Sequence, residues 1–472
     1  MAHPLRSPRR QAQSKPPARS EPSVRTFDWP LANEAESFLR RQVAAFHGRN
    51  TFARELAQRM GAETGTDFFE WTDHLVISPD EKQALQALGF APDRGAETTD
   101  GSIVYEHPRA MLPRVILRRS RAQSPSVVAL RPEFLSDFMA SHSLFGEPEG
   151  EPCSRYRRIP VSQENGTRLE AVERRAYRGF VPAPLKPGEL SRIIKARELL
   201  RTRPRRFASD AEGFKAANGI LDRAMALVGR DLACQFFFEA EREYWEGRNR
   251  AGRIQKHRQG QLGLGWGNHD HHTFRCSRAH FVDLVRFLLR LGFAKRERYY
   301  AGAEAGWGAQ VCEQPVTGIV VFADVDLLPA ETTVDFSTHK LPPSPRLGTV
   351  GLWVGLHGES FLQAGMHHLE ARFDFDLLRD QLKESGVSTM KPFSDFAFLR
   401  QAFTEGERWP VQEERLKRLL SARLITRGQF RRFDQEGAIG SHLENLQRHG
   451  GFKGFNQKAV SAVIADTDPR LP

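Results

Sequence analysis

The chain has 472 residues, of which 40% are hydrophobic and 27% charged, so it is not wholly disordered and has enough apolar side chains for about two or three domains. Lys and Arg exceed Asp and Glu by 11, which allows an anionic partner without requiring one. The four cysteines form no C-x-x-C pair, which argues against a disulfide scaffold or a structural zinc site. The sequence has no apolar run of about 18 residues and no apolar secretory segment, so we expect a cytoplasmic protein without a membrane span.

The N-terminal part of the chain changes composition near residue 30. Residues 1–25 are rich in Arg, Pro and Ser, which predicts a disordered basic tail. From residue 32 to 180, apolar residues recur with alternating helical and strand spacing. In chain order we predict a helix over Glu34–Met60, a strand over Phe69–Ser78, a helix over Asp80–Leu88, strands over Ile103–Glu106 and Arg114–Leu117, and a hairpin of Tyr156–Val161 with Arg168–Tyr177.

Residues 187–260 are helical in pattern and strongly basic, with an interruption at Pro204. Such a charge run usually marks the solvated face of a helical layer. The alternative is a surface that binds nucleic acid or a phosphorylated partner through Arg201–Arg206 and Arg248–Arg258, with Tyr244 and Trp245 available for stacking. A steep salt dependence of binding would support that alternative.

One sequence unit recurs three times, starting at Asp73-His74, at Asp270-His271-His272 and at His367-His368. Each copy is a histidine-bearing strand, a helix, a glycine stop and a further strand. The second copy continues into candidate strands Trp307–Cys312 and Gly318–Ala323. This βαβββ order predicts an α+β fold of small modules whose curved sheets pair to enclose a cup, an arrangement similar to that of the vicinal-oxygen-chelate enzymes.

Strand alternation indicates which side chains of the second copy share a face. It places His269, His271, Thr273 and Arg275 together and His272 on the opposite face, under the helix. A polar face of this kind is unfavourable in a core, because each unpaired buried polar group costs about 1–3 kcal/mol. A metal at the centre of the cup would satisfy this face.

The same alternation groups His368, Glu370 and Arg372 on the third copy's strand. His271 and His368 are therefore the candidate metal ligands, in preference to their sequence neighbours His272 and His367. The structural alternative, a pair of hydrogen-bonded core histidines, stays open at this point because the chain has 16 histidines.

A third ligand is expected near the C-terminus. The segment Ala438–Leu446 has the pattern of a strand with His442 and Glu444 on one face. Two imidazoles and one carboxylate from three strands form the facial triad typical of non-haem Fe(II) oxygenases, which leaves coordination positions open. His74 has no polar partner on its strand and is better explained as a core or edge histidine.

These residues resemble the 2-oxoadipate dioxygenase/decarboxylase (hydroxyglutarate synthase) family, whose fold is vicinal-oxygen-chelate-like. The resemblance covers about residues 260–472, and the family's Asp-His-x-x-Phe-Arg motif is complete. The matching segments are Asp270–Arg275, Leu291-Gly292-Phe293, Glu313-Gln314-Pro315, Ile319–Phe322, His368, Glu444 before Gly454-Phe455, and Asn456–Asp468 as the closing helix.

The resemblance implies that Fe(II) is the cofactor, that a 2-oxo acid and O2 are the substrates, and that CO2 is released. Arg275 would bind the distal carboxylate of the substrate, because a guanidinium binds carboxylates through two parallel hydrogen bonds. Arg372 has the same offset from its histidine and would be a second clamp, or else a surface ion pair. The implied metal ligands are His271, His368 and Glu444, and the implied substrate-binding residues are Arg275, Arg372 and Asn456.

The departures from the family pattern leave alternatives open. The surroundings of Glu444 match loosely, so Asp324 and Glu359 are further candidates for the acidic ligand. Ser78 replaces the arginine in the first copy, so we interpret residues 32–180 as a degenerate module with added strands, and residues 261–472 as the metal-binding catalytic domain. The other functional interpretations are a different metal enzyme of this fold (an extradiol dioxygenase, isomerase or lyase) or a basic binding protein. Nucleic acid is not the expected partner, and the sequence does not indicate an oligomeric state.

Overall fold

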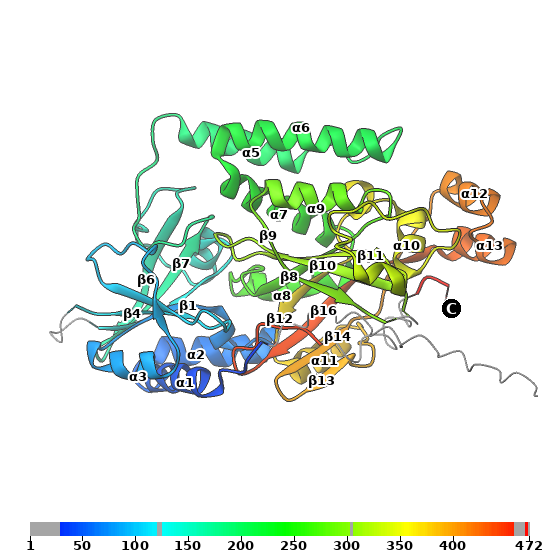
Figure 1. Cartoon of the computed structure of the whole chain (residues 1–472). Coiled ribbons are helices and arrows are strands. Elements are labelled where there is room, and N and C mark those ends of the chain that lie inside the picture. The colour runs from blue at the N-terminus through cyan, green and yellow to red at the C-terminus, as the bar shows by residue number, and fades with distance from the viewer. Residues whose placement is uncertain (1–28, 120–124, 303–304, 457–467, 471–472) are drawn as a thin grey trace, which may run out of the picture.

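A computed structural model describes residues 29–119, 125–302, 305–456 and 468–470 (Figure 1). The expected basic tail, residues 1–25, and nearly all of the expected closing helix, residues 457–467, lie outside the described residues. Two twisted sheets, one from each half of the chain, lie side by side, and a layer of helices runs across one side of the molecule (Figure 1).

The chain begins with two helices where the sequence predicted one. α1 (Asn33–His47) and α2 (Thr51–Arg59) are separated at Asn50, whose side chain accepts a hydrogen bond from the backbone N of Ala53 at 2.9 Å. An asparagine in extended backbone conformation at this position caps the second helix, and this is why the predicted helix is interrupted.

The first sheet has seven strands in the order β2-β3-β4-β1-β5-β7-β6. It contains two units, β1-α3-β2-β3-β4 and β5-α4-β6-β7, which meet through the antiparallel pair β1·β5. The sequence did not predict the second unit because β5 (sequence SVVAL) has no histidine, the residue that marks the first strand of the other three units. The bounds are β1 Thr72–Ile77, α3 Lys82–Ala87, β2 Ala91–Pro92, β3 Ile103–Glu106, β4 Arg114–Leu117, β5 Ser126–Leu130, α4 Leu135–Ser141, β6 Tyr156–Glu164 and β7 Thr167–Arg174.

Four helices then form the basic layer: α5 (Glu189–Arg201), α6 (Asp210–Val228), α7 (Arg230–Glu246) and α8 (Arg250–Gln261). Their apolar faces pack into the same core as the second sheet. Part of the positive charge of this layer is buried rather than exposed to solvent. The guanidinium of Arg203 donates to Glu241 at 2.7 Å, and the side chains of both are at most 1% exposed.

The second sheet has nine strands, with the path β13-β14-β16-β12-β8-β11-β10-β9 and with β15 paired to β16. Its two units, β8-α9-β9-β10-β11 and β12-α11-β13-β14-β16, each join their first and last strands in parallel and meet through the antiparallel pair β12·β8. The bounds are β8 His269–Arg275, α9 Phe281–Arg290, β9 Ala294–Tyr300, β10 Trp307–Glu313, β11 Val320–Asp326, β12 His368–Arg372, α11 Phe375–Glu384, β13 Ser394–Phe396, β14 Leu399–Phe403, β15 Glu407–Trp409 and β16 Ala438–Arg448.

The expected fold class is confirmed: an α+β arrangement of βαβββ modules of vicinal-oxygen-chelate type, with a basic helical layer. Three more helices, α10 (Thr349–His357), α12 (Glu413–Ser421) and α13 (Arg427–Glu436), pack together at one end around Leu352 and Leu416. Within the described ranges, every helix is too short or too polar to cross a bilayer.

Candidate metal centre

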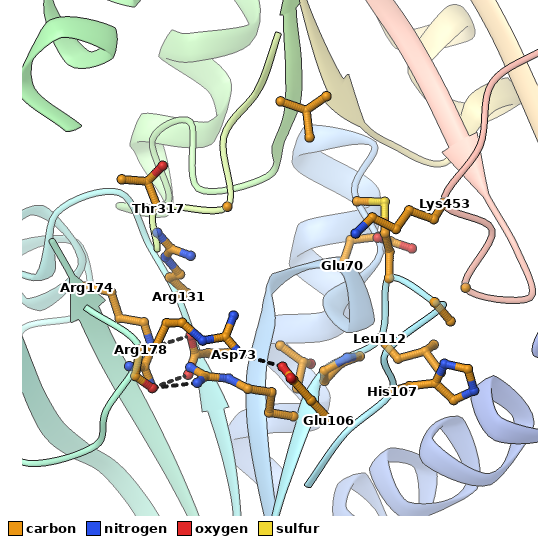
Figure 2. A pocket seen from close by; sticks show the side chains of 18 of the residues that line it. Glu70, Asp73, Glu106, His107, Leu112, Arg131, Arg174, Arg178, Thr317 and Lys453 are labelled. Atoms are coloured by element: carbon orange, nitrogen blue, oxygen red, sulfur yellow. Dashed lines mark hydrogen bonds and ion pairs between the residues drawn. The ribbon is translucent and has the colours of Figure 1, made fainter. Parts of the chain in front are cut away.

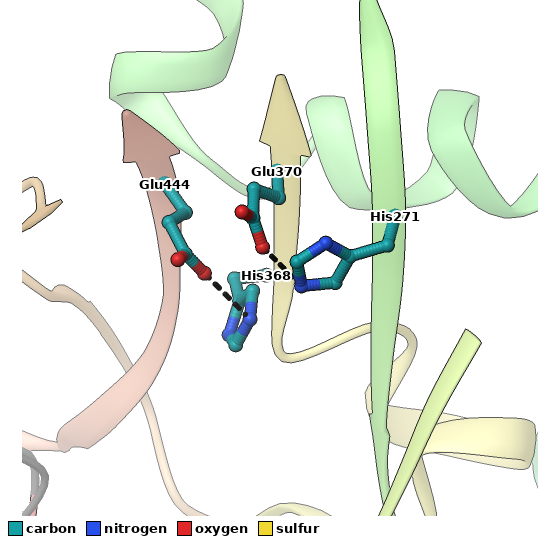
Figure 3. Close-up of side chains that lie close together, drawn as sticks. All are labelled: His271, His368, Glu370 and Glu444. Carbon is teal, nitrogen blue, oxygen red and sulfur yellow. Dashed lines mark ion pairs between the residues drawn. The ribbon is translucent and has the colours of Figure 1, made fainter. Parts of the chain in front are cut away.

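Four buried side chains converge at the middle of the second sheet: His271 from β8, His368 and Glu370 from β12, and Glu444 from β16 (Figure 3). Each offers one nitrogen or oxygen atom, and these atoms all lie within 4.8 Å of one another. The three ligands expected from the sequence are thus brought together, and Glu370 joins them as a fourth.

Strand register produces this convergence. Across the antiparallel pair β12·β8, Glu370 lies opposite His271, and across the parallel pair β12·β16 it lies beside Glu444. Because side chains alternate along a strand, His368 shares the face of Glu370. Three central strands therefore direct their polar side chains to one point.

The two modules contribute unequally to the cluster. Glu370 stands two residues after His368, and the corresponding position in the other module, two residues after His271, is Thr273. Glu444 pairs with Glu370 in the same way as Phe322 pairs with Thr273. One module thus supplies a histidine and two carboxylates, whereas the other supplies a histidine only.

Hydrogen bonds orient both imidazoles so that Nε2 faces the cluster. Nδ1 of His271 lies 3.2 Å from a carboxylate oxygen of Asp270, to which it donates, and Nδ1 of His368 lies 2.9 Å from Nδ1 of His367. Asp270 is itself held by the guanidinium of Arg448, at 3.2 and 3.0 Å. A carboxylate behind a ligating histidine fixes its tautomer and raises its basicity.

One amide group orients both carboxylates of the cluster. Nε2 of Gln401, on β14, donates to Glu370 at 3.2 Å and to Glu444 at 3.0 Å. The other oxygen of Glu444 lies 3.0 Å from Nε2 of His368, and the other oxygen of Glu370 contacts Nε2 of His271. The ligand atoms therefore point inward, at one another.

The electrostatics of the cluster favour a cation. Burial raises the pKa of Glu444 to about 7 and the pKa of Glu370 well above its ordinary value, and it lowers the pKa of His368 well below the usual value. In the part of the chain that the structure describes, no Lys or Arg lies within 4.0 Å of either carboxylate. Imidazole nitrogens and carboxylate oxygens in this number fit a divalent transition metal.

A small aromatic cavity of about 60 Å³ opens beside the cluster. Asn456 lines it, and Nδ2 of this side chain donates to the carbonyl of Phe393 at 3.1 Å. The aromatic lining is Tyr299, Trp307, Phe322, Phe393, Phe403 and Phe455.

The alternative acidic ligands lie outside the cluster. Asp324 lines the cavity, where burial raises its pKa to about 7, and its Oδ1 makes no hydrogen bond to the described residues. Glu359 accepts hydrogen bonds from the backbone N of Ser277, the shorter at 3.1 Å, and is absent from the group of candidate ligands. Neither residue replaces Glu444.

The two candidate arginines lie in different places despite their equal offsets. Arg275 is 4% exposed, does not line the aromatic cavity, and lies 5.8 Å from the ring of Trp353. Arg372 donates to Glu70 at 2.9 Å and lines a separate cavity between the two sheets. Arg372 is thus in an ion pair away from the cluster.

The expectation that His269 shares the face of His271 is wrong. The register of β8 and β12 shifts after Glu370, so that Ala371 lies opposite His269 and Asp270 is skipped. Such a bulge reverses the alternation beyond it. The ring of His269 accordingly packs against His272, at 5.4 Å between centroids.

His74 lies in the other sheet and belongs to no described group of candidate ligands. Its Nδ1 donates to Asp73 at 2.8 Å, and its ring packs edge-on against Phe180. It is a core histidine with a satisfied partner.

Sequence reasoning did not include Glu370 among the candidate ligands, although strand alternation placed it beside His368. A facial triad needs only one carboxylate, and Glu444 filled that place. The signal in the sequence that could have identified Glu370 was the presence of two polar residues, His368 and Glu370, on the same face of one strand.

No protein-family model and no curated protein matches the chain. Among solved structures, a mutant of 4-hydroxymandelate synthase from Streptomyces coelicolor is 13% identical, with 84% of this chain and 97% of that chain covered and a TM-score of 0.27. A xylose isomerase-like TIM barrel/4-hydroxyphenylpyruvate dioxygenase fusion protein is 11% identical, covering 84% and 52%, with a TM-score of 0.25. Methylmalonyl-CoA epimerase from Mycobacterium tuberculosis is 12% identical, covering 39% and 88%, with a TM-score of 0.22. Similarity at this level assigns neither an activity nor a substrate to this chain.

Proposed function

We propose that this chain is an Fe(II)-dependent oxygenase that decarboxylates a 2-oxo acid. The observation that carries the proposal is the convergence of His271, His368 and Glu444 within 4.8 Å in a buried cluster, which is the ligand set of a two-histidine, one-carboxylate iron site. Bound there, a ferrous ion would supply a Lewis-acidic and redox-active centre with positions left for a chelating 2-oxo acid and O2.

The side chains around the cluster hold and shield the reacting groups. Asp270 and His367 keep Nε2 of the two histidines directed into the cluster, where they would hold the ion, and Gln401 holds the carboxylates. The aromatic lining excludes water, which strengthens every electrostatic contact inside the cavity. The role of this chain is therefore to fix the geometry and to keep the site dry.

The small cavity bears on the size of the substrate. About 60 Å³ accommodates a few light atoms, so the site suits a short 2-oxo acid better than one with the length of 2-oxoadipate. A longer acid would require Phe393 or Phe455 to move. Arg275 is proposed to pair with the distal carboxylate of such an acid, because its buried Nε and Nη1 make no hydrogen bond to any described residue.

Glu370 favours a second candidate, a metal-dependent isomerase or lyase. Four protein ligands would occupy more of the coordination sphere than the facial triad and would suit Lewis-acid chemistry without O2. The two candidates differ in whether Glu370 ligates the ion or remains protonated beside it.

The interpretation as a nucleic-acid-binding protein receives no support from the helical layer. Trp245 is 1% exposed, and the hydroxyl of Tyr244 donates to the carbonyl of Gln363 at 2.8 Å. The aromatic side chains proposed for stacking are thus used inside the fold.

The decisive experiment is metal analysis of anaerobically purified protein, followed by O2 and CO2 measurements with pyruvate, 2-oxobutyrate and 2-oxoadipate. The proposal expects about one iron per chain and O2 uptake matched by CO2 release. Iron binding without O2 uptake on any 2-oxo acid would replace it with the isomerase or lyase candidate. Absence of any bound metal after reconstitution would contradict both.

A further inference from the structure

A second cavity, here called the inter-sheet cavity, lies between the two halves of the molecule (Figure 2). Its volume is about 510 Å³, far larger than that of the cavity at the metal cluster. One wall comes from β1, β3, β4 and β7 of the first sheet, and the other comes from the turn after β10 and from the ends of β12 and β16. None of the four clustered ligands lines it.

The lining of the inter-sheet cavity has an excess of positive charge. Eight basic side chains, seven arginines and one lysine, face five acidic ones. All five carboxylates are already paired. The pairs are Asp73 with Arg174 at 2.7 Å, Glu70 with Arg372 at 2.9 Å, Glu313 with Lys453 at 2.9 Å, Glu36 with Arg40 at 2.7 Å, and Glu106 with Arg178.

Among the lining residues that the structure describes, two guanidinium groups have no carboxylate within 4.0 Å, and that of Arg114 lies over the ring of Phe180, 4.5 Å from its centroid. No hydrogen bond or ion pair joins the side chain of Arg131 to another residue in the described ranges, and Arg114 donates only to the backbone carbonyl of Arg178. Figure 2 shows Arg131 near Arg174 and Thr317, on the opposite side of the hollow from Glu70 and Lys453. Burial lowers the pKa of Arg114 to about 10, helped by the charge of Arg174.

Unpaired arginines in a partly enclosed space are unfavourable unless an anion joins them. A charge removed from water without a partner is unfavourable, whereas a guanidinium binds carboxylate or phosphate through two parallel hydrogen bonds. We propose that the inter-sheet cavity binds a small molecule with two or more negative charges, carried by carboxylate or phosphate groups, and that Arg131 and Arg114 are its principal contacts.

The site is independent of the proposed metal chemistry, although the two places share structural support. Arg448 lines the inter-sheet cavity and also holds Asp270, the partner of His271. Arg448 and Asp270 thus connect one wall of the inter-sheet cavity to His271, whose side chain does not line this cavity.

The test is calorimetric titration of the full chain with inorganic phosphate and, separately, with glutarate. We expect wild-type protein to bind at least one probe. Arg131→Met and Arg114→Gln should each raise the Kd about tenfold or more, the loss of one charge-assisted contact. Arg286→Met, at a side chain 66% exposed on α9, should leave the Kd unchanged.

The outcomes identify the class of ligand, separate this site from the metal cluster, or overturn the proposal. Binding of phosphate alone indicates a phosphate ester as the natural ligand, and binding of glutarate alone indicates a dicarboxylate. Retained binding in His271→Ala separates this site from the metal cluster, whatever the outcome for the proposed function. Absence of binding of both probes to the wild type, or an unchanged Kd in folded Arg131→Met, overturns the proposal. Should Arg131→Met not fold, Arg114→Gln decides.

Discussion

Oδ2 of Asp270 accepts a hydrogen bond from Nδ1 of His271 at 3.2 Å and a second one from the guanidinium of Arg448 at 3.0 Å. Asp270 is the residue that the β-bulge leaves without a partner on β12. Its side chain can therefore lie next to that of the following residue, His271. The Arg448 charge holds the pKa of Asp270 far below its ordinary value against the opposing effect of burial. This relationship fixes the direction of the His271 imidazole, one of the candidate ligands.

Removing this support should weaken metal binding without removing a ligand. Asp270→Asn is expected to lower metal affinity about tenfold to a hundredfold, the usual effect of losing a hydrogen-bonded carboxylate behind a ligating histidine. Competition with a chromogenic chelator measures the affinity. Asp395→Asn, at a side chain 71% exposed, is the matched control. Equal affinity of Asp270→Asn and wild type would show that Asp270 does not support the site.

The number of protein ligands can be determined from two parallel substitutions. Under the oxygenase proposal, Glu444→Gln should lose the metal, whereas Glu370→Gln should keep it at near-normal stoichiometry. His271→Ala and His368→Ala should also lose it, because each removes one of three ligands. Metal content by atomic spectroscopy is the measurement, with the exposed His339→Ala as control. Loss of metal in Glu370→Gln equal to that in Glu444→Gln would instead indicate a four-ligand site.

Arg275 provides a test of substrate binding that leaves the metal intact. Arg275→Met should retain iron and raise the KM for a 2-oxo acid with a distal carboxylate about tenfold or more, with a smaller effect on pyruvate, which lacks that group. Steady-state O2 uptake with both acids gives the comparison. An equal loss with both acids would mean that Arg275 only supports the fold.

Stability at low pH should depend on Glu133, far from the cluster. Burial would raise its pKa, but Lys256 and Arg242 outweigh burial and lower the pKa to about 2. Its folded pKa is thus below the unfolded value near 4.5, so its contribution is complete above about pH 4.5 and disappears as the pH falls toward 2. The contribution is at most about 3 kcal/mol.

Glu133→Gln should therefore lower the free energy of unfolding at pH 7 and have a smaller effect at pH 3, measured by urea unfolding at each pH. Glu413→Gln, which removes an ion pair whose acidic side chain is 57% exposed, should have a small effect at both. A difference between Glu133→Gln and wild type that does not shrink at low pH would contradict the assignment.

The sequence by itself predicted the strand–helix units and the two histidines of the candidate metal centre. The change from alternating to helical spacing is local, and it marked the units that start at β1, β8 and β12. Alternation also selected His271 over His272 and His368 over His367, and the structure brings both selected residues to one cluster. These features depend only on residues that are close together in the sequence.

Only the tertiary structure decided which polar residues meet. Glu370 joins the cluster because β12 lies between β8 and β16. Arg372 lies outside it and donates a hydrogen bond to Glu70, which is 302 positions away in the chain. The bulge at Asp270 depends on how β8 and β12 pair, and no pattern within either strand encodes it. Periodicity is set by neighbouring residues, whereas register and ion-pair choice are set by strands and helices distant in the chain, which is why the first could be predicted and the second could not.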